Sequence, residues 1–154
     1  MAILMRYGKL EGDSLYEGYE GFFILTGLSW GLDWLSNIGS GRADVKAVAC
    51  SARAGSTGAL LLHEALGGRP SPATLVVGTW SGAEGVEPLL LATLDDAQVT
   101  GYASSHLSDT GTESFVVSFT AIHMSFTQNL PGPDGRMARR NAAALSVQAG
   151  RVQD

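Results

Sequence analysis

Apolar residues alternate with polar or small residues along much of the chain, and this two-residue period is that of a β-strand with one buried face. The alternation is found in five stretches, loosely over residues 2–10 and more clearly over residues 73–80, 86–94, 99–105 and 112–128. Polar turns separate most of these stretches. The pattern therefore predicts several antiparallel strands, with Asp95 and Asp96 marking the end of one strand or a bulge.

The stretch from Tyr19 to Gly31 supports two interpretations. Alternate positions indicate one long strand with a buried face formed by Phe22, Ile24, Thr26, Leu28, Trp30 and Leu32. The same stretch contains G-x-S-x-G around Ser29, the pattern that holds a serine nucleophile at a sharp strand-to-helix turn in hydrolases. That turn needs a helix directly after the serine, and the residues before the next glycine-rich loop are too few to form one. The strand is therefore favoured, with a small serine hydrolase using Ser29 as the alternative.

One helix is predicted in the body of the chain. Residues 59–66 have the spacing of an apolar helical face, and Ser56 or Thr57 can cap its start. Gly67 and Gly68 then end it, as glycines commonly do at a helix C-terminus. Together with the strands, this helix predicts a mainly β fold, an antiparallel β-barrel of two packed sheets with a single flanking α-helix.

The composition changes sharply after Leu130. Residues 131–135 are rich in proline and glycine, and the segment that follows them is basic and rich in alanine. We therefore expect one domain over residues 1–130 and a C-terminal extension over residues 131–154. Residues 137–148 are expected to form either a weak helix or a tail that becomes ordered by packing on an assembly.

Composition and charge restrict the functions that are expected for this protein. The 154 residues are enough for one domain, and only 16% of them are charged while 20 are glycine. Such a composition is typical of a sheet-rich protein, or of one with surfaces buried against copies of itself. The net charge of −5 argues against nucleic-acid binding. The sequence start does not resemble a signal peptide, and the apolar runs are too short to predict a membrane span.

No set of residues in the sequence has a convincing catalytic pattern. Cys50 is the only cysteine, and it stands among small residues without a recognisable nucleophile motif. His63, His106 and His123 are far apart in sequence and have no cysteine or carboxylate at ligand spacing. We therefore expect no catalytic residues, no metal and no cofactor. A compact barrel of this kind is expected to act through its surface.

Several ordered stretches resemble one known family, the Hcp (haemolysin co-regulated) proteins of type VI secretion systems. The stretches that carry the resemblance are Met1–Gly8, Glu11–Asp13, Phe23–Gly31, Leu61–Gly68, Val99–Tyr102 and Glu113–Ile122. They occur in the family's order and cover about residues 1–130. The resemblance implies a barrel with one flanking helix that assembles into homohexameric rings, and it implies no enzymatic activity.

In this family, stacked rings form the inner tube of a contractile machine in Gram-negative bacteria. The resemblance thus implies a structural tube subunit that carries or shelters secreted effectors in its lumen and contributes to virulence. The partners would be other copies of the chain, the contractile sheath, the spike protein and the effectors. The protein would assemble in the cytoplasm and be secreted without a signal peptide. Two alternatives are the tube protein of a phage tail or other contractile injection particle, and a monomeric ligand-binding barrel.

The resemblance also indicates a contact loop. Residues 37–52 correspond to the extended loop by which family members contact neighbouring subunits or rings. Its charged residues Arg42, Asp44 and Lys46 are therefore the candidates for pairing across a subunit contact. A solvated loop without such a role is the competing interpretation.

Overall fold

The computed structural model describes residues 1–34, 43–45, 47–81, 85–107, 110–131, 137–148 and 151–153. Within these residues the chain forms, in order, β1 (Ala2–Tyr7), β2 (Phe23–Ile24), β3 (Gly27–Ser29), β4 (Leu32–Trp34), β5 (Ala43–Val45), β6 (Val48–Arg53), α1 (Ser56–Gly67), β7 (Ser71–Ser81), β8 (Gly85–Leu107), β9 (Thr110–Ser118), β10 (Ala121–Pro131), β11 (Met137–Gln148) and β12 (Arg151–Gln153). In this part of the chain, no helix is long and apolar enough to cross a membrane.

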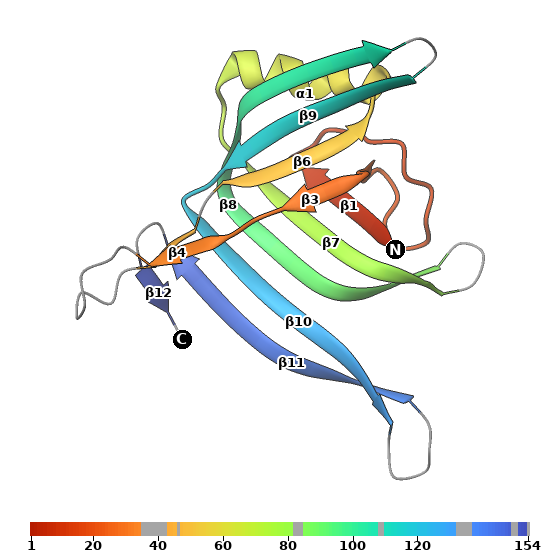
Figure 1. Cartoon of the computed structure of the whole chain (residues 1–154), viewed down its shortest axis with the longest axis vertical. Helices are drawn as coiled ribbons and strands as arrows, with labels where there is room; N and C mark the ends of the chain where they lie inside the picture. Colours follow the sequence, from red (N-terminus) through yellow and green to blue (C-terminus); the bar gives the residue numbers. More distant parts are fainter. Residues whose placement is uncertain are drawn as a thin grey trace.

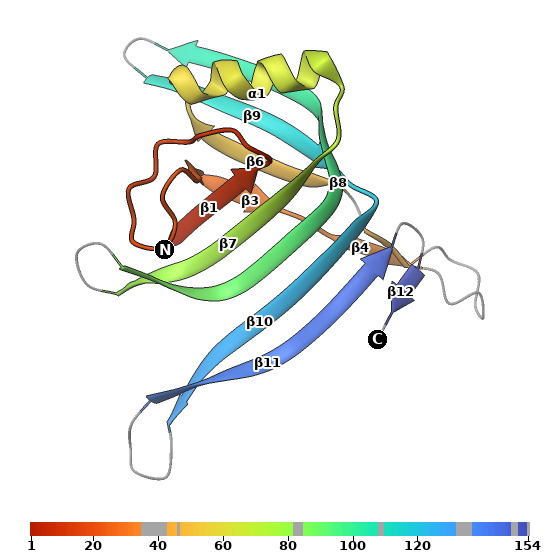
Figure 2. The same ribbon diagram turned by 180° about the vertical axis from the view of Figure 1, so that it is seen from behind.

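All described strands except β4 and β5 form two connected antiparallel sheets (Figures 1 and 2). One has the order β12-β11-β10-β8-β7-β1-β2, and the other has the order β3-β6-β9-β8. Strand β8 belongs to both, because its first half pairs with β7 and β10 and its second half pairs with β9. The mainly β, antiparallel fold with a single helix among the described residues is confirmed.

The ladders do not close into a continuous barrel. Strand β2 pairs with β1, whereas β3, three residues further on, pairs with β6. Between them the Leu25 N–H donates to the Ile3 carbonyl at 2.9 Å, and the Thr26 N–H donates to the Ser51 carbonyl at 2.8 Å. The segment therefore changes partner from one sheet to the other and joins their edges without a shared ladder.

This change of partner corrects the interpretation of residues 19–31. The stretch is not one long strand, and the face expected in the core is the wrong one. Phe23 and Leu25 are buried at 2% and 5% exposure, whereas Ile24 and Trp30 are 39% and 36% exposed. The register explains the difference, because Phe23 is opposite the core residue Met5. A shift of one residue exchanges the two faces of a strand.

The strands predicted over residues 86–105 and 112–128 also have different bounds in the structure. Residues 86–94 and 99–105 belong to one strand, β8, which continues through Asp96 in a left-handed conformation with φ of 48°. Residues 112–128 are instead divided, because β9 ends at Ser118 and β10 begins at Ala121. Thr120 lies at this junction and donates its backbone N–H to the Asp95 carbonyl at 3.0 Å. The bend of β8 and the break between β9 and β10 thus lie together, where the chain changes from one sheet to the other.

The C-terminal segment is also different from the expectation. The weak helix proposed for residues 137–148 is wrong, because this segment is strand β11 and pairs with β10 along its whole length. The β10–β11 hairpin projects away from the rest of the molecule (Figure 1). Pairing with β10 therefore overrides the low strand propensity of the alanines.

Helix α1 lies across β8 and β9 (Figure 2). Its residue Leu61 is 2% exposed and belongs to the same core cluster as Leu75, Leu94, Phe115 and Val117 from the sheets. Gly68 ends the helix in a left-handed conformation, as predicted for the glycine pair. The start is different from the prediction, because Gly55 is the N-cap and no side chain caps the helix.

Candidate assembly surfaces

The residues considered for catalysis are not gathered into a site. Ser29 lies in β3 opposite Ala49, and the next element is strand β4 rather than a helix, so the strand-to-helix turn of a hydrolase is not formed. In the described part of the chain, no group of three His, Cys, Asp or Glu residues is placed to hold a metal ion. Cys50 is buried, and burial raises the pKa of its thiol to about 12. It therefore stays in the unreactive thiol form at neutral pH.

The histidines occupy separate places. His63 is exposed on α1, and His106 is exposed near the end of β8. His123 lies on the outward face of β10, where its Nε2 is 2.9 Å from Oδ2 of Asp95. That pair lies beside the bend of β8, so His123 contributes to the junction between the two sheets.

The predicted contact loop is described only in part, and its last residues, 48–52, belong to strand β6 rather than to a loop. Asp44 lies in β5, where it is opposite Asp33 of β4 in a two-stranded ladder separate from the main sheets. Arg42 and Lys46 lie outside the described residues. Strand β5 lies close to β12, so this ladder is placed beside the C-terminal strands. The position of the ladder at the periphery (Figure 1) is compatible with a contact role, which stays a prediction.

The projecting hairpin forms a second exposed feature that the sequence did not suggest. The ladder between β8 and β10 ends at the pair Leu90–Phe126, and beyond it the two hairpins diverge (Figure 1). Among the described strands, β11 pairs on its second side only through residues 146–148, with β12. Strand edges of this kind are templates for pairing with another chain. The signal available in the sequence was the alternation up to residue 128, which predicts only most of the first strand of the hairpin.

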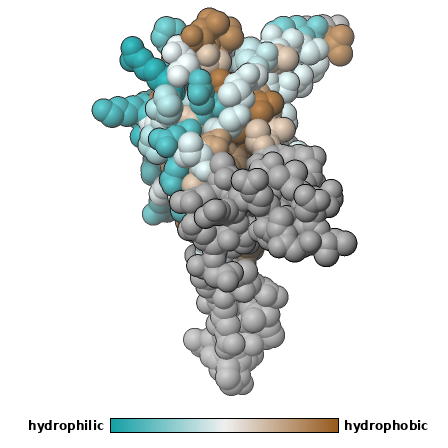
Figure 3. All heavy atoms as spheres, turned by 90° about the vertical axis from the view of Figure 1, so that its left-hand side faces the viewer, coloured by the Kyte–Doolittle hydropathy of each residue, from teal (hydrophilic) through white to brown (hydrophobic). Residues whose placement is uncertain are grey.

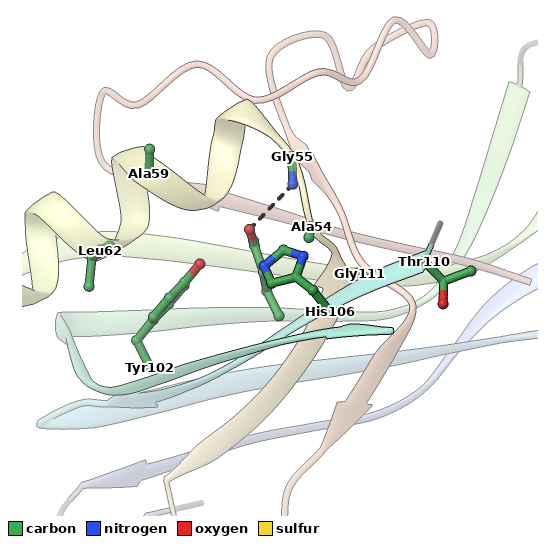
Figure 4. A pocket seen from close by; sticks show the side chains of 9 residues that line it. Ala54, Gly55, Ala59, Leu62, Tyr102, His106, Thr110 and Gly111 are labelled. Carbon is green, nitrogen blue, oxygen red and sulfur yellow. Dashed lines mark hydrogen bonds between the residues drawn. The ribbon is translucent and has the colours of Figure 1, made fainter. Parts of the chain in front are cut away.

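A third feature is a cavity of about 560 Å³ between the start of α1 and the ends of β8 and β9 (Figure 4). Tyr102, His106 and Glu113 line it together with small residues and Leu62. Exposed leucines surround this end of the molecule, at Leu60, Leu62 and Leu66 on α1 and at Leu107 on β8. Figure 3 shows apolar atoms at the upper end of the molecule.

Glu113 was not among the residues predicted to be functional, although the sequence pattern contained a signal for it. The buried positions of β9 are Glu113, Phe115 and Val117, so a charged residue continues the apolar phase of the strand. Glu113 is 5% exposed, and its Oε1 accepts a hydrogen bond from the Gly55 N–H at 3.3 Å. Burial raises the pKa of Tyr102, and the charge of Glu113 and a hydrogen bond to its carboxylate raise it further.

Comparison with known proteins supports the fold. The sequence matches no protein-family model and no curated protein. Solved structures do match, over nearly the whole chain. One is described as a type six secretion system protein, with a TM-score of 0.78 and 13% identity over 96% of this chain and 94% of that chain. Hcp1 from Salmonella typhimurium has a TM-score of 0.76 and 14% identity over 99% and 98%.

A third match is the secreted protein Hcp3 from Pseudomonas aeruginosa, with a TM-score of 0.63 and 17% identity over 91% of this chain and 97% of that chain. The protein therefore has the antiparallel β fold of type VI secretion system proteins. Within that class, its fold is that of the Hcp proteins, which confirms the resemblance noted in the sequence.

Proposed function

We propose that this protein is a structural tube subunit of a type VI secretion system. The observation that carries the proposal is the match to Hcp1, which covers 99% of this chain and 98% of that chain. A match of this extent leaves little of either protein outside the shared fold. In this role the chain forms homohexameric rings that stack into an inner tube and carry or shelter effectors in the lumen. The sheath, the spike protein and the effectors are its further partners, and it assembles in the cytoplasm before secretion.

The interior of the fold supports this role over that of a ligand-binding barrel. The space between the two sheets is filled by a continuous cluster of buried side chains from β1, β6, β7, β8, β9, β10 and α1. A ligand-binding barrel would instead have a deep apolar pocket there. The Ser29 hydrolase is not supported, since its strand-to-helix turn is not formed. The matching solved structures described above are type VI secretion proteins, and they do not favour the phage-tail alternative. The boundary at residue 130 between an Hcp-like domain and an extension stays part of the proposal.

Imaging and mass measurement test the proposal directly. Purified full-length protein is expected to show rings with a central hole in negative-stain electron microscopy. Light scattering is expected to give the mass of six 16.1-kDa chains, about 97 kDa. A protein that stays strictly monomeric at high concentration would contradict the proposed function.

The contact loop gives a second test. Asp44→Lys is expected to raise the dissociation constant of the assembly about tenfold, because it reverses a charge in the loop proposed to contact a neighbouring subunit. The unfolding free energy is expected to change by only about 0.5 kcal/mol, as is usual at the surface. The matched control is Glu17→Lys, which makes the same charge change at an exposed position outside the loop. Equal assembly of the two variants would remove Asp44 from the contact, and Arg42 and Lys46 would then be tested in the same way.

A further inference from the structure

The cavity at the start of α1 contains a buried carboxylate in a position to bind a cation. Glu113 is 5% exposed, its Oε1 accepts a hydrogen bond from the Gly55 N–H at 3.3 Å, and Tyr102 lines the same cavity. An ionised carboxylate has about four acceptor positions, so this hydrogen bond leaves part of its capacity free. Among the described side chains, no Lys, Arg or His forms an ion pair with Glu113. The N-terminal end of α1 carries a partial positive charge, which offsets part of the free-energy cost of burying the Glu113 carboxylate. A paired cation would offset more of this cost.

The lining of the cavity suits an arginine side chain. Tyr102 and His106 both extend from β8 beside the Gly55–Glu113 hydrogen bond, so that aromatic rings flank the carboxylate (Figure 4). A guanidinium group can bond a carboxylate through two parallel N–H groups while stacking on an aromatic ring. Leu62 and Ala59 add apolar surface for the aliphatic part of the side chain. The cavity therefore combines the contacts for the charged end and for the stem of one long basic residue.

The chain itself contains a matching basic group. Three of its ten Lys and Arg residues lie within five positions, at Arg136, Arg139 and Arg140, although the net charge is −5. Arg139 and Arg140 lie in β11 opposite Asn129 and Gln128, near the end of the projecting hairpin. That end of the hairpin and helix α1 are at opposite ends of the longest axis of the molecule (Figure 1). The hairpin of one chain therefore does not reach its own cavity, so a hairpin arginine in this cavity has to come from another copy.

We infer that the Glu113 cavity of one copy receives an arginine from the β10–β11 hairpin of a neighbouring copy. The inference rests on the proposed function, because it assumes that copies associate. Such a contact joins two different surfaces, so it is heterologous and repeats from copy to copy. The site is complete only when the neighbouring hairpin supplies its cation.

Disulfide trapping between two variants tests this contact. Leu62→Cys places a thiol at the cavity, where Leu62 is 40% exposed, and Ala138→Cys places one beside the arginines without replacing any of them. The two variants are mixed and oxidised mildly, and cross-linked dimers are counted on non-reducing gels. The matched control replaces Leu62→Cys by Leu15→Cys, at a residue that is 86% exposed on another surface. Native Cys50 gives little background, because its pKa is about 12.

The Leu62/Ala138 mixture is expected to cross-link at least about tenfold faster than the control, a difference of about 1.4 kcal/mol. Adding Glu113→Gln to the Leu62→Cys variant is expected to remove most of this advantage, since the amide keeps the size and lacks the charge. Replacing Arg139 and Arg140 by Gln in the Ala138→Cys variant is expected to do the same. Equal rates in the two mixtures would overturn the inference, and so would fast cross-linking that neither set of substitutions slows.

Light scattering on the same samples before oxidation distinguishes a failure of the cavity contact from a failure of the proposed function. Assembled protein that does not cross-link at these positions refutes the cavity contact and leaves the tube subunit standing. Monomeric protein refutes both. A third outcome also overturns the inference: argininamide protects the wild-type protein from thermal unfolding, but the hairpin substitutions leave cross-linking unchanged. The cavity would then bind a basic ligand other than the hairpin.

Discussion

Replacing Phe23 by alanine is expected to lower the free energy of unfolding by about 3–5 kcal/mol, the usual cost of removing a buried aromatic side chain. Phe23 is 2% exposed and belongs to the core cluster, opposite Met5 of β1. Ile24→Ala is expected to cost only about 1 kcal/mol or less, because Ile24 is 39% exposed on the other face of the same strand. Comparing the stabilities of the Phe23→Ala and Ile24→Ala variants therefore shows which face of β2 is buried.

Urea denaturation followed by circular dichroism gives both values, at one fixed protein concentration because association stabilises the folded state. Phe22→Ala is a useful third variant, since Phe22 is only half-buried and contacts the Tyr19 ring at 5.4 Å between centroids. A larger loss for Ile24→Ala than for Phe23→Ala would restore the register expected from the sequence and contradict the observed one.

This register could not be obtained from the sequence for a physical reason. Phe22 and Phe23 are both aromatic, and apolar residues occur at both phases of the alternation between them and Leu28. The pattern alone therefore supports either face. The strands that pair with the segment determine which of its faces is buried. It pairs first with β1 and then with β6, which come from separate parts of the chain. Alternation in the sequence indicates that a strand has one buried face, but it does not predict which strands pair with it.

The same limit explains the other differences. The prediction of α1 succeeds because its apolar spacing and terminal glycines are local features. Strand β11 was missed because its alanine-rich sequence has little strand propensity and its order comes from β10. Glu113, Tyr102 and Gly55 come together only through the pairing of β8 with β9 and the docking of α1, so no motif joins them. The candidate site was therefore less accessible to sequence reasoning than the fold class.

Gly58→Ala is expected to destabilise the protein by about 1–3 kcal/mol, although alanine normally favours a helix. A Cβ atom at Gly58 would overlap the carboxylate of Glu113. The side chain would have to move and break its hydrogen bond to Gly55, which leaves a buried carboxylate poorly satisfied. Gly67→Ala is the matched control in the same helix, because a Cβ there has no atom within 4 Å. That variant is expected to gain up to about 1 kcal/mol.

A double-mutant cycle attributes the loss to Glu113. In a Glu113→Ala background the overlap is removed, so Gly58→Ala is expected to be neutral or to stabilise by up to about 1 kcal/mol, as Gly67→Ala does. The interaction free energy of the Gly58–Glu113 pair is then about 1–4 kcal/mol, and that of Gly67 with Glu113 is close to zero. Thermal and urea unfolding of the wild type, the three single variants and the two double variants measure both values. Additive losses at Gly58 and Glu113 would mean that the carboxylate is not held against α1, and the cavity would then lack the fixed negative charge on which its binding of an arginine depends.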